Sequence, residues 1–199
     1  MNGADFFRSC LTVASCRLKT FVLFNFLFFS CVFGALFLLQ FLLLPPVYSG
    51  WSPWLLEAFL GNWGLMFLGV FAFNLAVSAF VMVTLPGFVF FPLSVGFLLY
   101  RAFLWAMLLY AVPSWLFLAT LPTLVLEGEA YVFAAVAGTI TGMSWFKPAW
   151  LFKTEAGEEE LSRAEGFRKG LSECLRLYII VALLLFVAAI LETVTILSI

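Results

Sequence analysis

The chain contains five long runs of apolar residues, and the short stretches between them hold most of its charges. A helix needs about 20 consecutive apolar residues to cross the hydrocarbon core of a bilayer. Each run reaches that length, so the pattern predicts an all-α polytopic membrane protein with five transmembrane helices. The predicted spans are Thr20–Leu44, Trp63–Leu85, Phe88–Val112, Leu124–Trp145 and Leu175–Leu197.

Prolines mark the expected ends of the first two spans. Pro45-Pro46 follows the first run and Pro86-Gly87 follows the second. Proline lacks a backbone donor and disfavours helix just before it. The connection 45–62 is rich in Trp and Tyr, which favour the headgroup level of a membrane. Within it, a serine N-cap followed by proline predicts a short interfacial helix over Pro53–Leu60.

A third proline divides the longest apolar stretch. Ser114–Gly142 is too long for one straight crossing and contains Pro122. We expect a half-helix over Ser114–Leu121, and then a main helix from Leu124 to Trp145, which would bring the helical segments to six. Non-helical backbone at membrane depth is tolerated only where protein or water covers it. A break beside Glu127 would therefore mark a candidate site.

The segment 146–174 is the one part of the chain that resembles a soluble protein. Phe146–Arg176 holds six of the ten basic residues and six of the eleven acidic ones. Apolar residues spaced by roughly one helical turn between Glu158 and Leu175 predict an amphipathic helix. We expect this helix to lie along the membrane surface, separate from the last span.

Composition supports a membrane location for the whole chain. Of its 199 residues, 65% are hydrophobic and only 11% are charged, against about 25% charged in an ordinary soluble domain. Lipid must cover so much apolar surface, and residues 1–199 are predicted to form a single transmembrane domain. The first run is too long for the apolar core of a signal peptide and is read as an anchor. No basic stripe with interleaved aromatics indicates nucleic acid binding.

Lysine and arginine predict the orientation. The tail 1–19 carries three basic residues, the connection 45–62 carries none and Phe146–Arg176 carries six. By the positive-inside rule, the tail and the segment 146–174 lie in the cytoplasm, and 45–62 lies outside it. Five crossings satisfy this arrangement and place the C-terminus outside. The predicted location is the plasma membrane.

Four charged residues lie within or beside the apolar runs: Arg101, Glu127, Glu129 and Glu192. A charge near the bilayer centre costs about 3 kcal/mol on insertion scales, so it tends to face a partner charge, a helix interface or water. Arg101 could bind a carboxylate through two parallel hydrogen bonds. Alternatively its helix breaks near Gly96–Tyr100 and its side chain reaches a membrane surface.

Glu127 is the strongest candidate because of the helical face it occupies. At 100° per residue it shares a face with Ala134, Gly138 and Gly142, whose small-xxx-small spacing lets two helix backbones approach closely. In a functional reading Glu127 binds an ion, relays a proton or anchors a polar substrate. In a structural reading it accepts backbone hydrogen bonds across the break or pairs with Arg101. Glu129 points elsewhere and is expected to be solvated at an interface.

Two further polar positions face other helices. Asn74 and Ser78 are four residues apart in the second span, where interhelical hydrogen bonding would explain them. Glu192 shares a face with Ala188 and Thr195, so it should point toward protein. The candidate intramembrane polar site therefore comprises Glu127, Arg101, Asn74 and Glu192.

Several kinds of chemistry lack their signatures. The chain has no histidine, and it contains no phosphate-binding loop, dinucleotide fingerprint, zinc-protease motif or serine nucleophile elbow. Its four cysteines, Cys10, Cys16, Cys31 and Cys174, lack the paired short spacing of a zinc site and are read as free thiols. We therefore expect a noncatalytic protein with no metal and no cofactor.

Short motifs along the chain resemble the stage II sporulation protein M family of bacterial and archaeal membrane proteins. In order, they are Phe73-Asn74, Leu85-Pro86-Gly87, Gly96, Leu121-Pro122 followed by Glu127, Ala137-Gly138 and Ala188-Ala189-Ile190-Leu191-Glu192. The resemblance covers roughly Gly61–Ile199. The family has proline–histidine–glycine, two residues and then glutamate before its small-residue helix. Pro122 and Glu127 match that pattern, whereas the histidine and glycine are absent.

The resemblance implies a five- or six-helix membrane protein that acts in a cell-envelope complex. In spore formers the family works with a lytic enzyme and another membrane protein during engulfment. The expected function is therefore a noncatalytic scaffold or subunit, with the lipid bilayer, protein partners or further copies of itself as partners. The alternatives are a transporter or channel with a polar site around Glu127 and Arg101, or the membrane subunit of an ABC-type exporter.

Overall fold

The computed structural model describes residues 3–42, 62–111, 114–152 and 161–197, and within these ranges all regular structure is helical. Five helical stretches are long and apolar enough to cross a membrane, which confirms the all-α polytopic fold. They are Leu18–Leu42, Trp63–Val89, Pro92–Ala111, Leu116–Phe146 and Arg163–Ile196. The interfacial helix predicted over Pro53–Leu60 lies outside the described residues.

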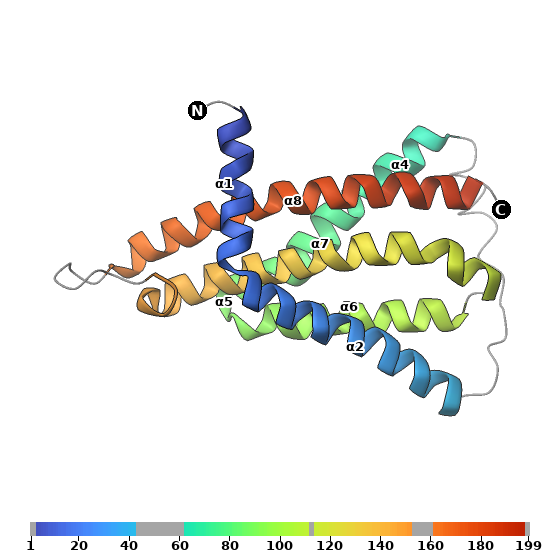
Figure 1. Cartoon of the computed structure of the whole chain (residues 1–199). Helices are drawn as coiled ribbons and strands as arrows, with labels where there is room; N and C mark the ends of the chain where they lie inside the picture. The colour runs from blue at the N-terminus through green and yellow to red at the C-terminus, as the bar shows by residue number, and fades with distance from the viewer. Residues whose placement is uncertain (1–2, 43–61, 112–113, 153–160, 198–199) are drawn as a thin grey trace.

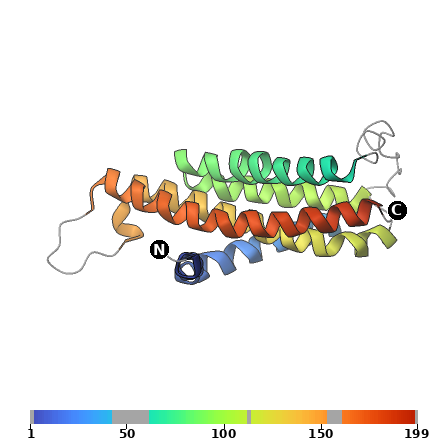
Figure 2. The ribbon, with the colours of Figure 1, turned by 90° about the horizontal axis from the view of Figure 1, so that it is seen from above.

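The long helices run alongside one another and form an elongated bundle (Figures 1 and 2). Successive stretches run in opposite directions, so the turn near Phe90 and the end of the helix at Phe146 share one end of the bundle. The starts of the second and fourth stretches share the other end. This alternation matches five antiparallel crossings, whereas the side that faces the cytoplasm stays a prediction.

The N-terminal tail is a helix of its own. Helix α1 (Gly3–Cys16) is seen end-on in Figure 2, while the bundle helices run across the view. It therefore lies nearly perpendicular to the bundle axis, parallel to the plane of a membrane. Its Cys10 and Val13 are buried, and Phe7 and Leu11 are exposed. An ion pair of 3.0 Å joins Arg17, just after α1, to Glu173.

Helix α2 (Leu18–Leu42) presents a narrow stripe to the bundle. Its buried residues recur every four positions, Phe24, Phe28, Val32 and Leu36. This spacing is that of one helical face. The stripe packs mainly against the third and fourth long helices. Most of the remaining surface of α2 is apolar and exposed.

The second crossing is continuous beyond its expected end. It comprises α4 (Trp63–Ala72), the π-helical stretch η1 (Phe73–Thr84) and α5 (Leu85–Val89). The prediction that it ends at Pro86-Gly87 was wrong, because Pro86 stands in the first turn of α5, where its missing N–H disrupts little. Helix α6 (Pro92–Ala111) accordingly begins four residues later than the predicted Phe88.

The predicted break at Pro122 is absent. Helix α7 runs without interruption from Ser114 to Phe146 with Pro122 inside it. Pro122 is exposed on the outer surface of the bundle. Its ring therefore meets no neighbouring helix, and transmembrane helices tolerate a proline of this kind.

The separate surface helix predicted before the last span is also absent. Its C-terminal part is the first half of α8 (Arg163–Leu197), a single helix of 35 residues. At about 1.5 Å per residue this helix is much longer than a hydrocarbon core of about 30 Å. Gly166 and Gly170 hold its first half against α7, since a Cβ at Gly166 would lie 2.7 Å from the Ser144 carbonyl oxygen. The short 3₁₀-helix η2 (Pro148–Trp150) follows α7 and precedes α8 in the chain.

The small-residue seam of α7 is where the sequence placed it. A Cβ at Gly138 would lie 2.7 Å from the carbonyl oxygen of Thr84, and a Cβ at Gly142 would clash with the carbonyl of Gly87. Ala134 is fully buried, and its carbonyl accepts a 2.9 Å hydrogen bond from the hydroxyl of Thr84. The seam brings η1 and α5 into direct backbone contact with α7.

Candidate functional site

Three helices bring a connected set of polar side chains into the interior of the bundle. Asn74 comes from η1, Arg101 from α6, and Glu127 and Tyr131 from α7. Asn74 Nδ2 donates to Glu127 Oε1 over 2.7 Å. Glu127 is only 2% exposed. A buried carboxylate needs such donors, because burying an unpaired charge is strongly unfavourable.

Tyr131 connects Arg101 to Glu127. Arg101 Nη2 donates to the Tyr131 hydroxyl over 2.7 Å. The single hydroxyl proton of Tyr131 has two acceptors, Asn74 Oδ1 at 3.1 Å and Glu127 Oε2 at 3.2 Å. The guanidinium carbon also lies 4.7 Å from the centre of the Tyr131 ring. Tyr131 is therefore the centre of the network.

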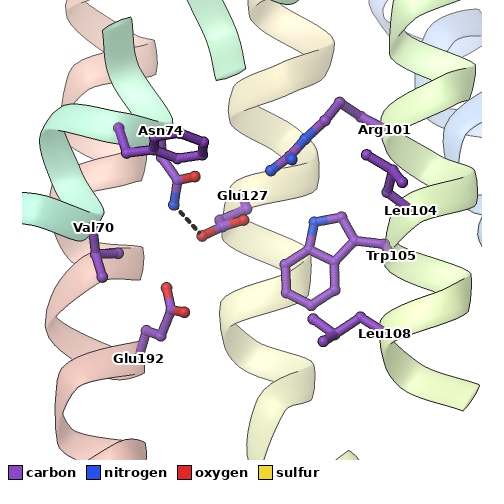
Figure 3. A pocket seen from close by; sticks show the side chains of 9 residues that line it. Val70, Asn74, Arg101, Leu104, Trp105, Leu108, Glu127 and Glu192 are labelled. Atoms are coloured by element: carbon purple, nitrogen blue, oxygen red, sulfur yellow. Dashed lines mark hydrogen bonds between the residues drawn. The ribbon is translucent and has the colours of Figure 1, made fainter. Parts of the chain in front are cut away.

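The two sequence-based alternatives for Arg101 both need correction. Helix α6 is unbroken at Gly96–Tyr100, and the Arg101 side chain points into the bundle (Figure 3). Within the described ranges, however, no carboxylate lies within 4 Å of the Arg101 guanidinium; the ion pair found there joins Arg17 to Glu173. Arg101 therefore does not pair directly with Glu127. Sequence reasoning missed Tyr131, although it lies one turn after Glu127 on the same helical face.

A cavity of about 250 Å³ adjoins this network. Figure 3 shows Glu192 of α8 entering from one side, with Arg101 and Trp105 of α6 on the other side. The remaining walls are largely apolar. The complete lining is Val70, Phe73, Asn74, Arg101, Leu104, Trp105, Leu108, Glu127 and Glu192. All four predicted site residues therefore line one cavity.

Two donors in the cavity wall lack acceptors in the part of the chain that the structure describes. They are Nε of Arg101 and Nε1 of Trp105, both without solvent exposure. Trp105 as a whole is 9% exposed. Buried N–H groups in proteins are nearly always hydrogen-bonded. Trp105 was not among the residues predicted from the sequence, although its i, i+4 relation to Arg101 puts both on one face of α6.

Ser78 and Glu129 lie outside this cavity. Ser78 is buried, and its hydroxyl has no hydrogen-bond partner among the described residues. Glu129 faces α2 and accepts a 3.1 Å hydrogen bond from Asn25 Nδ2. It is half-buried beside an open groove. Glu129 is therefore hydrogen-bonded within the protein, whereas the sequence predicted a solvated side chain.

The described ranges contain no group of three His, Cys, Asp or Glu side chains that could hold a metal ion. Cys10, Cys16, Cys31 and Cys174 are free thiols, as the spacing predicted.

Comparisons with known proteins add no relative. No family model, curated protein or solved structure matches the chain. The resemblance to stage II sporulation protein M therefore rests on the short motifs alone. The site itself offers a guanidinium, two carboxylates and an indole N–H around a small cavity.

Proposed function

We propose that this membrane protein binds a small polar solute in the cavity between η1, α6, α7 and α8 and takes part in moving it across the bilayer. The observation that carries the proposal is the cavity lining, which combines Arg101 with Glu127 and Glu192. Ionisable side chains within a membrane are costly and typically mark substrate or ion pathways.

The depth of the cavity fits a transport site. Asn74 lies 11 residues from the start of α4 at Trp63, and Arg101 lies 10 residues from the end of α6 at Ala111. At about 1.5 Å per residue, both are roughly 15–17 Å from that end of the bundle. A hydrocarbon core is about 30 Å thick. The site is thus near the midplane, where secondary transporters bind their substrates.

Flux into liposomes tests this function. The full chain would be reconstituted and offered amino acids, amines, polyols, sugars and monovalent ions. We expect one class to enter faster than into protein-free vesicles, and Glu192→Gln to reduce that flux. Glu129→Gln is the matched control, because Glu129 lies outside the cavity. If no solute enters faster and none raises the thermal stability of the protein, the proposal is wrong.

A second candidate is the noncatalytic subunit or scaffold of a cell-envelope complex, similar to stage II sporulation protein M. The observation that favours it is the polar pair Asn25–Glu129, which borders an open groove on the lipid side of α2 and α7. Asn25 Oδ1 has no donor among the described residues. Polar groups at membrane depth are normally covered by protein, so a helix of another subunit would cover the partly exposed Glu129.

Cross-linking tests the subunit proposal. Ser30 lines the same groove, so Ser30→Cys in native membranes should cross-link to a protein partner or to a second copy. Gly96→Cys, on another helix at an open position, is the control. Exclusive monomer from Ser30→Cys would contradict this candidate. An ATPase among the captured proteins would instead indicate the membrane subunit of an ABC-type exporter.

The finer localisation is part of the proposal. We infer a plasma-membrane protein with a cytoplasmic N-terminus, on the strength of the lysine and arginine distribution. Helix α1 would then lie at the inner surface of the bilayer, with its exposed Phe7 and Leu11 available to lipid.

A further inference from the structure

The α6 wall of the cavity offers hydrogen-bond donors. Arg101 Nε and Trp105 Nε1 are both buried and lack acceptors among the described residues. They lie four residues apart, on one face of α6, and Figure 3 shows the Trp105 indole nitrogen turned toward Arg101 and Glu127. No described carboxylate lies within 4 Å of the Arg101 guanidinium. This wall therefore holds unpaired donors for an anionic group, and the neighbouring Glu127 carboxylate is already hydrogen-bonded to Asn74 and Tyr131.

The α8 wall offers the opposite charge. The Glu192 carboxylate projects into the cavity from the side facing α6 (Figure 3). It accepts no hydrogen bond from a described residue, in contrast to Glu127, which accepts from Asn74 and Tyr131. An ionised carboxylate has room for several donors. Glu192 is thus the carboxylate that remains free for a cationic group.

The size and walls of the cavity limit what fits between these two ends. Drug-sized ligands occupy pockets of about 300–1,000 Å³, and this cavity is about 250 Å³. Val70, Leu104 and Leu108 provide apolar wall in the same cavity. A compact molecule with a short aliphatic part is the best match.

We propose that the cavity binds a small zwitterion that carries one carboxylate and one ammonium group, of about the size of alanine. The carboxylate accepts from Arg101 Nε and Trp105 Nε1, and the ammonium donates to Glu192. Charge-assisted hydrogen bonds of this kind are roughly twice as strong as neutral ones. The inference rests on the proposed function, because it names the solute class of the same site.

Binding of radiolabelled alanine to the full chain in nanodiscs tests the proposal, with competition by alaninamide and propionate. Alaninamide keeps the ammonium and lacks the carboxylate; propionate keeps the carboxylate and lacks the ammonium. We expect each analogue to compete roughly tenfold or more weakly than alanine, because each loses a charged hydrogen bond. Glycine and β-alanine extend the test to shorter and longer zwitterions.

Variants test which side chain contacts the carboxylate and which contacts the ammonium of the ligand. Glu192→Gln should weaken alanine binding roughly tenfold or more and leave propionate competition unchanged. Trp105→Phe should weaken alanine and propionate but spare alaninamide. Glu129→Gln should alter none of them. A thermal melt of each variant without ligand shows whether the bundle is intact.

The inference can fail in two ways, either alone or together with the proposed function. If alaninamide competes as well as alanine, the site takes simple cations, and the zwitterion is wrong while a polar-solute site remains. The same holds if no zwitterion binds but another solute of the flux panel does. If no ion, amine, polyol, sugar or amino acid binds, the proposed function fails and the inference fails with it.

Discussion

The Tyr131 hydroxyl lies between Arg101 and Glu127, 2.7 Å from the Nη2 of Arg101 and 3.2 Å from the Oε2 of Glu127. A charge pair in the interior of a membrane bundle is thus joined through a neutral side chain. The arrangement keeps the Glu127 carboxylate hydrogen-bonded, while the buried Arg101 Nε has no acceptor among the described residues.

The first prediction is that Tyr131 carries the coupling between Arg101 and Glu127. Arg101→Ala should be severe, and adding Glu127→Gln should partly restore stability, because removing one member of a buried pair costs about 3–5 kcal/mol. In a Tyr131→Phe background that restoration should shrink. The measurement is thermal unfolding in detergent for the double-mutant cycle in both backgrounds. An unchanged coupling energy would show that the two charges interact without the hydroxyl.

The second prediction compares the two neighbouring carboxylates of α7. Glu127→Gln replaces one of the two carboxylate oxygens with an NH₂ group, so either Asn74 Nδ2 or the Tyr131 hydroxyl loses its acceptor. This change should destabilise the fold by about 1–3 kcal/mol. Glu129→Gln should have a smaller effect, because Glu129 is half-buried and has one donor, Asn25. The midpoints of thermal denaturation decide between them. Equal losses would mean that Glu127 is no better partnered than Glu129.

The third prediction concerns the helix seam. Gly138→Ala and Gly142→Ala should destabilise the bundle, since the added Cβ would strike backbone atoms of Thr84 and Gly87. Gly34→Ala and Gly96→Ala are matched helical controls with nothing within 4 Å of the added carbon. They should be neutral, or stabilising by up to about 1 kcal/mol from helix propensity. Similar denaturation midpoints for all four variants would place the close contact elsewhere.

The fourth prediction is the orientation. Cys16 is exposed at the end of α1, so a membrane-impermeant thiol reagent should modify it only after the cells are opened. Ser49→Cys in a Cys16→Ser background, in the connection 45–62, should be modified in intact cells. The gel shift of a maleimide-polymer adduct gives the readout. Modification of Cys16 in intact cells would show that the topology is the reverse of the predicted one.

The fifth prediction concerns the attachment of α1. Arg17→Glu places a like charge opposite Glu173 and should release α1 from α8, seen as faster amide hydrogen exchange in Gly3–Cys16. The charge-reversed double variant with Glu173→Arg should recover protection, because the half-buried pair is restored with opposite polarity. Exchange in α6 serves as the internal reference. No change in α1 exchange with Arg17→Glu would show that apolar contacts of Cys10 and Val13 suffice.

Hydropathy and residue spacing alone determined the number of crossings, the all-α fold and the face of α7 that meets other helices. These features are local: a bilayer demands about 20 apolar residues per crossing, and a backbone can approach closely only where side chains are small, as at Gly138 and Gly142. The burial of Glu127 followed from its place on that face. Asn74, Arg101 and Glu192 were chosen for their polarity at membrane depth.

Only the tertiary structure decided how these residues meet. The rotation and crossing of α6, η1 and α8 around α7 put Tyr131 between Arg101 and Glu127, and turned Trp105 into the same cavity. The first half of α8 stays upright because Gly166 and Gly170 pack on α7. Each outcome depends on the shape of a neighbouring helix, which a local pattern of polar and apolar positions does not contain.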